Sequence, residues 1–288
     1  RFKETMRKMN QNTLMKGYKW FYNPSNMVLS VVSRKPFHDW TKILFHSNFT
    51  KEHFHKKTEI PQNALQFPNQ EPYKPQTADI NHTNKSGSNN THLVFGFRTV
   101  NQYSDKKYVF ELLTYILNGM SGRLFTILRH EQSLVYNVSA NSQQEEYNGY
   151  FAIYTEFSNQ HLKTVIKLLL ELCEELVKNG IREEEFSIGK SRIHGAYNIK
   201  YENVNTFAEH NGCEHLIFVR DTENSRHYQK KKVVPFQNNL STFHNKITLN
   251  QINNTIKEYF RQTNMVISIV NSEKIDEKSI RRLCEKYP

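Results

Sequence analysis

The apolar residues of the chain recur with helical spacing in several segments. Positions i, i+3, i+4 and i+7 are apolar over residues 109–117 and again over 162–176, and a glycine follows each segment. This spacing predicts two amphipathic helices that end before Gly119 and Gly180. Three consecutive glutamates at 183–185 predict the first turn of another helix, because the helix dipole favours acids there. Thr248-x-x-Gln251 predicts a capping box that opens one more helix.

Strands are predicted where apolar runs are short and lie between turn-forming residues. One strand is expected to begin at His92, and further strands are expected at residues 134–140, 149–157 and 265–270. A turn-rich stretch at 141–148 separates two of them. Neighbouring strands joined by a short turn predict antiparallel pairing, and the helices fall in separate segments. We therefore expect an α+β fold in which an antiparallel-rich sheet is covered by helices on one face.

A repeat relates the two ends of the chain. The string NMVLSVV at residues 26–32 is nearly matched by NMVISIV at residues 264–270. Each string follows a helical segment that ends in aromatic residues, and each precedes another helix-like segment. Residues 26–32 are therefore predicted to form a buried strand. A repeat of this length predicts a duplicated-domain architecture, in which this chain holds the end of a first domain and only the second domain is complete.

Proline and asparagine mark a linker between the two domains. Four prolines between positions 61 and 75 precede a polar run of asparagine and serine at 81–90. Such a composition is extended where it is rich in proline and flexible where it is polar. We divide the chain into residues 1–56, the tail of the first domain, residues 57–91, the linker, and residues 92–288, the second domain.

Charge and cysteine content indicate which classes of partner and which cellular compartment to expect. The 288-residue chain has a net charge of +11, but its one dense basic run is Lys230–Lys232, and the other cations are scattered among acids. Because no recognition motif accompanies this charge, we expect no nucleic-acid partner. The absence of a long apolar stretch predicts that no segment spans a membrane. Three widely spaced cysteines and a polar N-terminus favour an intracellular, cytoplasmic location.

Histidines are the first candidates for metal ligands, and their spacing argues against a site. Zinc sites on a helix typically use two histidines at i and i+4 with a neighbouring glutamate. His53 and His55 are only two residues apart near His46, whereas His210 and His215 are five apart with a glycine between them. We therefore predict no metal ligand in this chain. No phosphate-binding loop or G-x-S-x-G motif indicates another catalytic centre.

One long segment is distinctive. Residues 118–140 read NGMSGRLFTILRHEQSLVYNVSA. This segment resembles the C-terminal-domain signature of the pitrilysin/insulinase-type zinc metallopeptidases, which include mitochondrial processing peptidases: a small-residue turn, L-F-x-x-L-R, E, and L-x-Y-x-V-x-A. Further segments resemble the family in the same order, at 21–29 and 179–190. Ser33-Arg34 departs from the Gly-Asp that is usual in the family.

The resemblance implies a hydrolase, a zinc metalloendopeptidase whose zinc lies outside this chain. In the family the zinc-binding helix carries H-x-x-E-H in the domain before the 21–32 segment, and this sequence has no such motif. Residues 1–56 would then be the tail of a catalytic-type domain. The resemblance predicts that this chain is inactive alone and that zinc, the cofactor, is bound in the missing N-terminal domain.

Two residues can be carried over by position, Arg129 and Tyr136. The resemblance implies that they face the zinc across a cavity, bind the substrate backbone and stabilise the oxyanion. A guanidinium and a phenolic hydroxyl are suitable donors for a carbonyl that becomes tetrahedral. The alternative is structural: Arg129 would bond nearby carbonyls or Glu131, and Tyr136 would be a core residue of a strand.

The resemblance also leaves the activity of the protein open. One hypothesis is an active endopeptidase whose partners are a peptide or protein substrate and its own upstream catalytic domain. The other is a non-catalytic relative that binds peptides or serves as a scaffold subunit, as processing-peptidase partner subunits and respiratory-complex core proteins do. An H-x-x-E-H motif upstream of this chain would favour the first.

Overall fold

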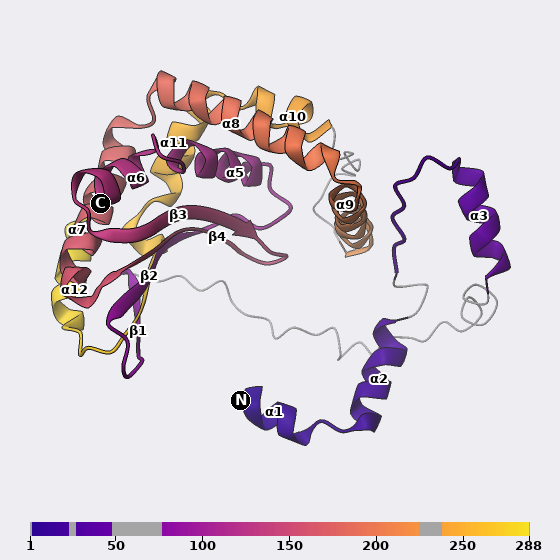
Figure 1. Ribbon diagram of the computed structural model, residues 1–288, viewed down its shortest axis with the longest axis horizontal. Coiled ribbons are helices and arrows are strands. Elements are labelled where there is room, and N and C mark those ends of the chain that lie inside the picture. Colours follow the sequence, from indigo (N-terminus) through magenta and orange to yellow (C-terminus); the bar gives the residue numbers. More distant parts are fainter. Residues whose placement is uncertain (1, 23–26, 48–76, 225–237, 288) are drawn as a thin grey trace. The chain divides into compact units, whose positions relative to one another are not determined.

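The structure, a computed structural model, describes residues 2–22, 27–47, 77–224 and 238–287 (Figure 1). The chain forms two units. One unit holds residues 1–72 and 200–236, and the other holds residues 73–199 and 237–288. Helix α8 (Glu183–Glu202) begins in the second unit and ends in the first.

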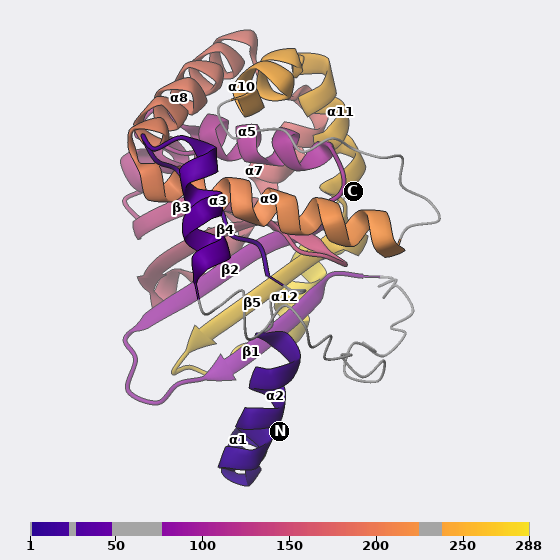
Figure 2. The same cartoon turned by 90° about the vertical axis from the view of Figure 1, so that its right-hand side faces the viewer.

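The second unit is built on a five-stranded sheet with the strand order β1-β5-β2-β4-β3 (Figure 2). Its strands are β1 (Asp79–Asn84), β2 (Asn90–Thr99), β3 (Val135–Gln144), β4 (Gly149–Ser158) and β5 (Met265–Asn271). Three of the four strand pairs are antiparallel, and only β1 with β5 is parallel. The predicted antiparallel-rich sheet is confirmed.

The sheet buries one face more completely than the other. Buried residues alternate with half-buried ones along β5, from Met265 to Asn271. The register places Phe95 between Ile153 and Ile267, and Phe97 between Phe151 and Met265. Because side chains of neighbouring strands in register share a face, these residues form one continuous apolar layer. Phe97 also stacks on Phe260 beyond the sheet, at a centroid distance of 4.3 Å.

Helices cover the apolar layer, and Figure 1 shows α5, α8 and α11 together on one side of the sheet. The helical segments of this unit, besides α8, are α5 (Lys106–Leu117), α6 (Arg123–Phe125), η3 (Thr126–Glu131), η4 (Asn159–His161), α7 (Leu162–Asn179), α10 (Asn239–Thr242), η6 (His244–Lys246), α11 (Leu249–Tyr259), η7 (Gln262–Asn264) and α12 (Glu277–Cys284). The α+β fold is therefore confirmed.

The predicted helix ends are also present. Gly180 follows α7 with a φ of +74°, a backbone conformation that residues with a side chain rarely adopt. Thr248 caps α11, accepting a hydrogen bond from the Gln251 N–H while the Gln251 side chain accepts one from the Thr248 N–H. The local signals in the sequence thus fix where these helices begin and end.

The first unit, by itself, consists of helices in the residues that the structure describes. They are α1 (Phe2–Lys8), α2 (Gln11–Phe21), α3 (Phe37–His46) and α9 (Val204–Asn224), together with the end of α8. Helix α2 ends in the aromatic residues expected before the repeated string. Helix α3 confirms the helix expected after it.

The buried strand predicted at residues 26–32 is wrong for the part that the structure describes, since residues 27–33 form no strand. Leu29 is 63% exposed, and Val31 and Val32 are each 41% exposed. A buried strand needs neighbouring strands for its backbone hydrogen bonds, and the described residues of this unit contain none. Residue 26 lies outside the described residues.

Some elements of the structure cross the predicted boundaries of the division. Strand β1 lies inside the expected linker at 57–91 and pairs with β5 along its whole length. Its polar sequence DINHTN lacks the apolar pattern by which strands are predicted. Residues 200–236 group with the N-terminal residues and not with the second unit. Residues 48–76, which include most of the expected linker, lie outside the described residues, so the domain division stays a prediction.

Candidate active site

Arg129 lies in an irregular helix. Helix α6 continues at Thr126 into η3, a π-helix, in which each hydrogen bond spans five residues rather than four. Such helices are rare and are frequent at functional sites. Arg129 is exposed, and its Cζ lies over the Phe125 ring at 5.3 Å from the centroid. Its guanidinium makes no hydrogen bond or ion pair with residues that the structure describes.

Tyr136 is the extra residue of a β-bulge in β3. The register shifts so that Val135 faces Phe157 and Asn137 faces Glu156, two consecutive residues of β4. Tyr136 therefore has no partner on β4, and a bulge of this kind re-aims its side chain. Tyr136 is 59% exposed, and its hydroxyl has no hydrogen-bond partner in the described part of the chain. A core role for Tyr136 is thus not what the structure shows.

A tight turn connects the two residues. The Ser133 N–H donates to the Arg129 carbonyl at 3.1 Å, and the Leu134 N–H donates to the Leu128 carbonyl at 3.1 Å. Ser133 has a φ of +49°, which is uncommon for a residue other than glycine. Because η3 also packs against β3, the side chains of Arg129 and Tyr136 project from adjacent elements, and both are exposed to solvent.

The small-residue turn before η3 is shaped by close approaches. A Cβ on Gly122 would lie 2.2 Å from the Leu117 carbonyl oxygen, so no other residue fits there. Gly119 has a φ of +88°, and a Cβ there would lie 3.0 Å from the Arg192 guanidinium. Arg192 of α8 donates to the Asn118 carbonyl and, at 2.6 Å, to the Ser121 hydroxyl. The guanidinium therefore holds the turn that leads into α6 and η3.

A buried ion pair fixes the start of α6. Arg123 is 9% exposed, and its Nε and one terminal nitrogen donate to the two carboxylate oxygens of Glu185 at 2.6 and 2.7 Å. It also donates to the Gly180 carbonyl at 3.0 Å. Burial opposes ionisation of Glu185, but hydrogen bonds from Arg123 and Arg182 outweigh it and lower the pKa of Glu185 to about 2. The pair joins α6 to α8.

A second buried polar cluster was not predicted. His244 is fully buried, and its Nε2 lies 2.8 Å from a carboxylate oxygen of Glu111 in α5. The Tyr197 hydroxyl of α8 donates to the same carboxylate at 3.1 Å. Burial and the nearby Glu111 charge raise the pKa of Tyr197, so its hydroxyl stays a donor. Three segments that are distant in sequence meet here, and local sequence patterns cannot reveal such a contact. Because these polar groups form hydrogen bonds with one another, the cluster has a structural role.

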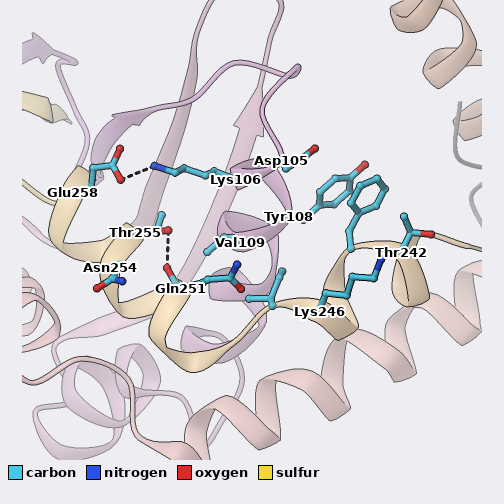
Figure 3. A pocket seen from close by; sticks show the side chains of 12 residues that line it. Asp105, Lys106, Tyr108, Val109, Thr242, Lys246, Gln251, Asn254, Thr255 and Glu258 are labelled. Carbon is cyan, nitrogen blue, oxygen red and sulfur yellow. Dashed lines mark hydrogen bonds and ion pairs between the residues drawn. The ribbon is translucent and has the colours of Figure 1, made fainter. Parts of the chain in front are cut away.

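A pocket of about 420 Å³ lies between the start of α5 and α11 (Figure 3). Two polar contacts join residues that line it: Lys106 pairs with Glu258 at 2.5 Å, and the Thr255 hydroxyl donates to the Gln251 carbonyl at 2.8 Å. Neither Arg129 nor Tyr136 lines it. The pocket is therefore distinct from the predicted site.

The described residues contain no group of three or more histidine, cysteine, aspartate or glutamate side chains that could hold a metal ion. His210 pairs with Glu214 at 4.0 Å, and the His46 ring bonds the Lys42 carbonyl at 2.7 Å. His53 and His55 lie outside the described residues. None of the helices formed by these residues has the length and apolar composition of a membrane span.

The fold and the 118–140 segment define a domain of the M16 peptidase class. The chain belongs to the family described as the peptidase M16 inactive domain, whose model matches residues 8–193. This match confirms the resemblance to pitrilysin/insulinase-type zinc metallopeptidases. The family description itself distinguishes this domain from a catalytic one.

Known proteins similar to this chain carry the same class of name. The chain is 26% identical over 145 residues to a Bacillus subtilis protein called uncharacterized zinc protease YmxG, covering 50% of this chain and 36% of that protein. A protease structure from Helicobacter pylori superposes with a TM-score of 0.69 at 15% identity, covering 93% of this chain and 60% of that one.

A third similarity is to a structure of complex III₂ from Candida albicans, with a TM-score of 0.58 at 14% identity, covering 72% of this chain and 49% of that one. At these identities the two structures show a shared fold. The chain spans about a third of the curated relative and at most about 60% of these two structures.

Proposed function

We propose that this chain is the C-terminal part of a zinc metalloendopeptidase and that it contributes donors for the transition state rather than the zinc site. By the intact protein we mean this chain together with an upstream catalytic domain that carries H-x-x-E-H and the zinc. The observation that carries the proposal is the presentation of Arg129 and Tyr136. Both side chains reach solvent from irregular elements, without polar partners in the described part of the chain.

The chemistry of these two groups suits peptide hydrolysis. When a nucleophile adds to a peptide carbonyl, negative charge develops on the carbonyl oxygen. A guanidinium and a phenolic hydroxyl both donate hydrogen bonds, and donors fixed in advance stabilise that charge without reorganising. The residues of this chain that the structure describes do not form a metal site, so activation of water belongs to the upstream domain in this proposal.

The proposal requires the two domains to enclose the substrate. Residues 1–56 would complete the upstream catalytic domain, the part of residues 57–91 that precedes β1 would connect the domains, and residues 92–288 would bring Arg129 and Tyr136 to the substrate. Closure of this kind excludes water and completes the catalytic arrangement only when substrate is present. The name zinc protease carried by the Bacillus subtilis relative supports assigning the intact protein to the zinc proteases.

A second candidate is a non-catalytic subunit that binds peptides or acts as a scaffold. We keep this candidate because the chain shares its fold with a chain of the complex III₂ structure from Candida albicans. The two candidates differ in what happens to a bound peptide: an endopeptidase converts it to fragments, whereas a binding subunit releases it intact.

The test is an assay of the intact protein with a set of unstructured peptides. We expect hydrolysis of internal peptide bonds that stops when a zinc chelator is added and returns when zinc is restored. Binding of the same peptides without any cleavage, by protein that contains stoichiometric zinc, would support the non-catalytic candidate instead.

A further inference from the structure

The core face of β4 contains one polar residue among apolar ones. Phe151, Ile153 and Phe157 alternate along this strand and are almost fully buried, and Thr155 lies in the same row with only 4% exposure. A valine has the same shape as a threonine and needs no hydrogen bond. A buried hydroxyl that lacks a partner is costly, so the hydroxyl at this position must have a specific partner.

The partner is the β-bulge. Thr155 Oγ1 donates to the backbone carbonyl of Asn137 at 2.7 Å, immediately after Tyr136. A bulge disrupts the regular ladder and leaves backbone groups without their usual strand partners. The Thr155 hydroxyl therefore supplies a hydrogen bond to the displaced backbone.

A second hydrogen-bonded clamp holds β3 from its free edge. Strand β3 lies at the edge of the sheet, so one side of its backbone has no neighbouring strand among the described residues. The Asn118 side chain donates to the Ala140 carbonyl at 2.8 Å and accepts from the Ala140 N–H at 2.7 Å. This amide imitates a neighbouring strand at that point. Arg192 in turn holds the Asn118 carbonyl, so α8 supports the clamp.

We propose that Thr155 is a positioning residue for Tyr136, with the Asn118 amide as its counterpart on the free edge. The inference rests on the proposed function, because it assigns to Thr155 the task of aiming a phenol that acts on substrate. Thr155 does not touch the substrate in this scheme. Its hydroxyl fixes the Asn137 carbonyl, and the bulge then fixes the direction of Tyr136.

Thr155→Val in the intact protein removes the hydroxyl and keeps the shape. We expect kcat to fall about 10- to 100-fold with little change in KM, since misplacing a reacting group by about 1 Å costs up to about 100-fold. Thr155→Ser keeps the hydroxyl and should restore most of the turnover. Ile153→Val on the same face is the matched control: it should lower the melting temperature slightly and leave kcat near the wild-type value.

A double-mutant cycle shows whether Thr155 acts through Tyr136. In a Tyr136→Phe background, Thr155→Val should lower kcat no further, because the group it positions is already absent. If Thr155→Val keeps wild-type turnover, or lowers it by the same factor in both backgrounds, Thr155 does not position Tyr136.

Amide hydrogen exchange gives a readout that does not depend on activity. Thr155→Val should accelerate exchange in the segment 135–138, whereas Thr155→Ser and Ile153→Val should not. If the intact protein cleaves no peptide, or if Tyr136→Phe has no effect on turnover, the proposed function fails and this measurement still decides whether Thr155 holds the bulge. Unchanged exchange in Thr155→Val overturns the inference.

Discussion

Replacing Arg129 with alanine, or Tyr136 with phenylalanine, should lower the kcat of the intact protein by about 100- to 1000-fold each, the usual effect of losing one oxyanion donor. The loss should appear in kcat more than in KM, because both groups act on charge that exists mainly in the transition state. Zinc content and melting temperature should stay near wild-type values, since both side chains are exposed and make no hydrogen bond or ion pair with the described residues.

Measuring stability and turnover on the same samples separates this role from a structural one. Met120 is 82% exposed and lies in the turn before α6, so Met120→Ala is a control that should change neither property. A packing role for Arg129 and Tyr136 predicts early melting with normal turnover per folded molecule. That outcome would remove both residues from the proposed site.

Replacing Arg123 with alanine should lower the free energy of unfolding by about 3 to 5 kcal/mol, because it leaves the Glu185 carboxylate buried without its main partner. Arg123 is 9% and Glu185 14% exposed, and the two are joined through two hydrogen bonds. Denaturant unfolding of the chain measures the change. Arg182→Ala is the control: Arg182 also contacts Glu185, but its side chain is 71% exposed, so its loss should cost far less.

Acid should reproduce part of this loss in the wild-type protein. The pKa of Glu185 is lowered in the folded state from the usual 4.5 to about 2. The stabilisation from this group is therefore fully present above about pH 4.5 and is lost as the pH falls toward 2. The Glu185→Gln variant should lack this part of the pH dependence. Equal pH profiles for the two proteins would show that the pair does not contribute as proposed.

The sequence predicted the regular elements of the second unit because their signals are local. The helix that precedes Gly180 and the capping box at Thr248 depend on residues a few positions apart. Strand β1 was missed because its sequence is polar and its order depends on β5, almost 190 residues away. The prediction of a strand at 26–32 is wrong in its described part for the opposite reason. The apolar sequence suits a strand, but the described residues of its unit contain no strand with which it could pair.

The candidate site was predictable in residue identity but not in geometry. Arg129 and Tyr136 were found by resemblance alone. The sequence contains one indication of the bulge: Val135 and Ala140 are both apolar, and both are buried, although they are five residues apart. On a regular strand such residues face opposite sides. The positions of Thr155 and Asn118 near this bulge depend on strand register, which no local pattern specifies.

We propose above all that this chain supplies transition-state donors to a zinc site located elsewhere. The most direct test is metal analysis and peptide hydrolysis on the 288-residue chain and the intact protein, purified and assayed in parallel. We expect about one zinc ion per molecule and peptide cleavage for the intact protein, and neither for the 288-residue chain. Tightly held, stoichiometric zinc in the 288-residue chain, or peptide cleavage by it alone, would show that the zinc site lies in this chain.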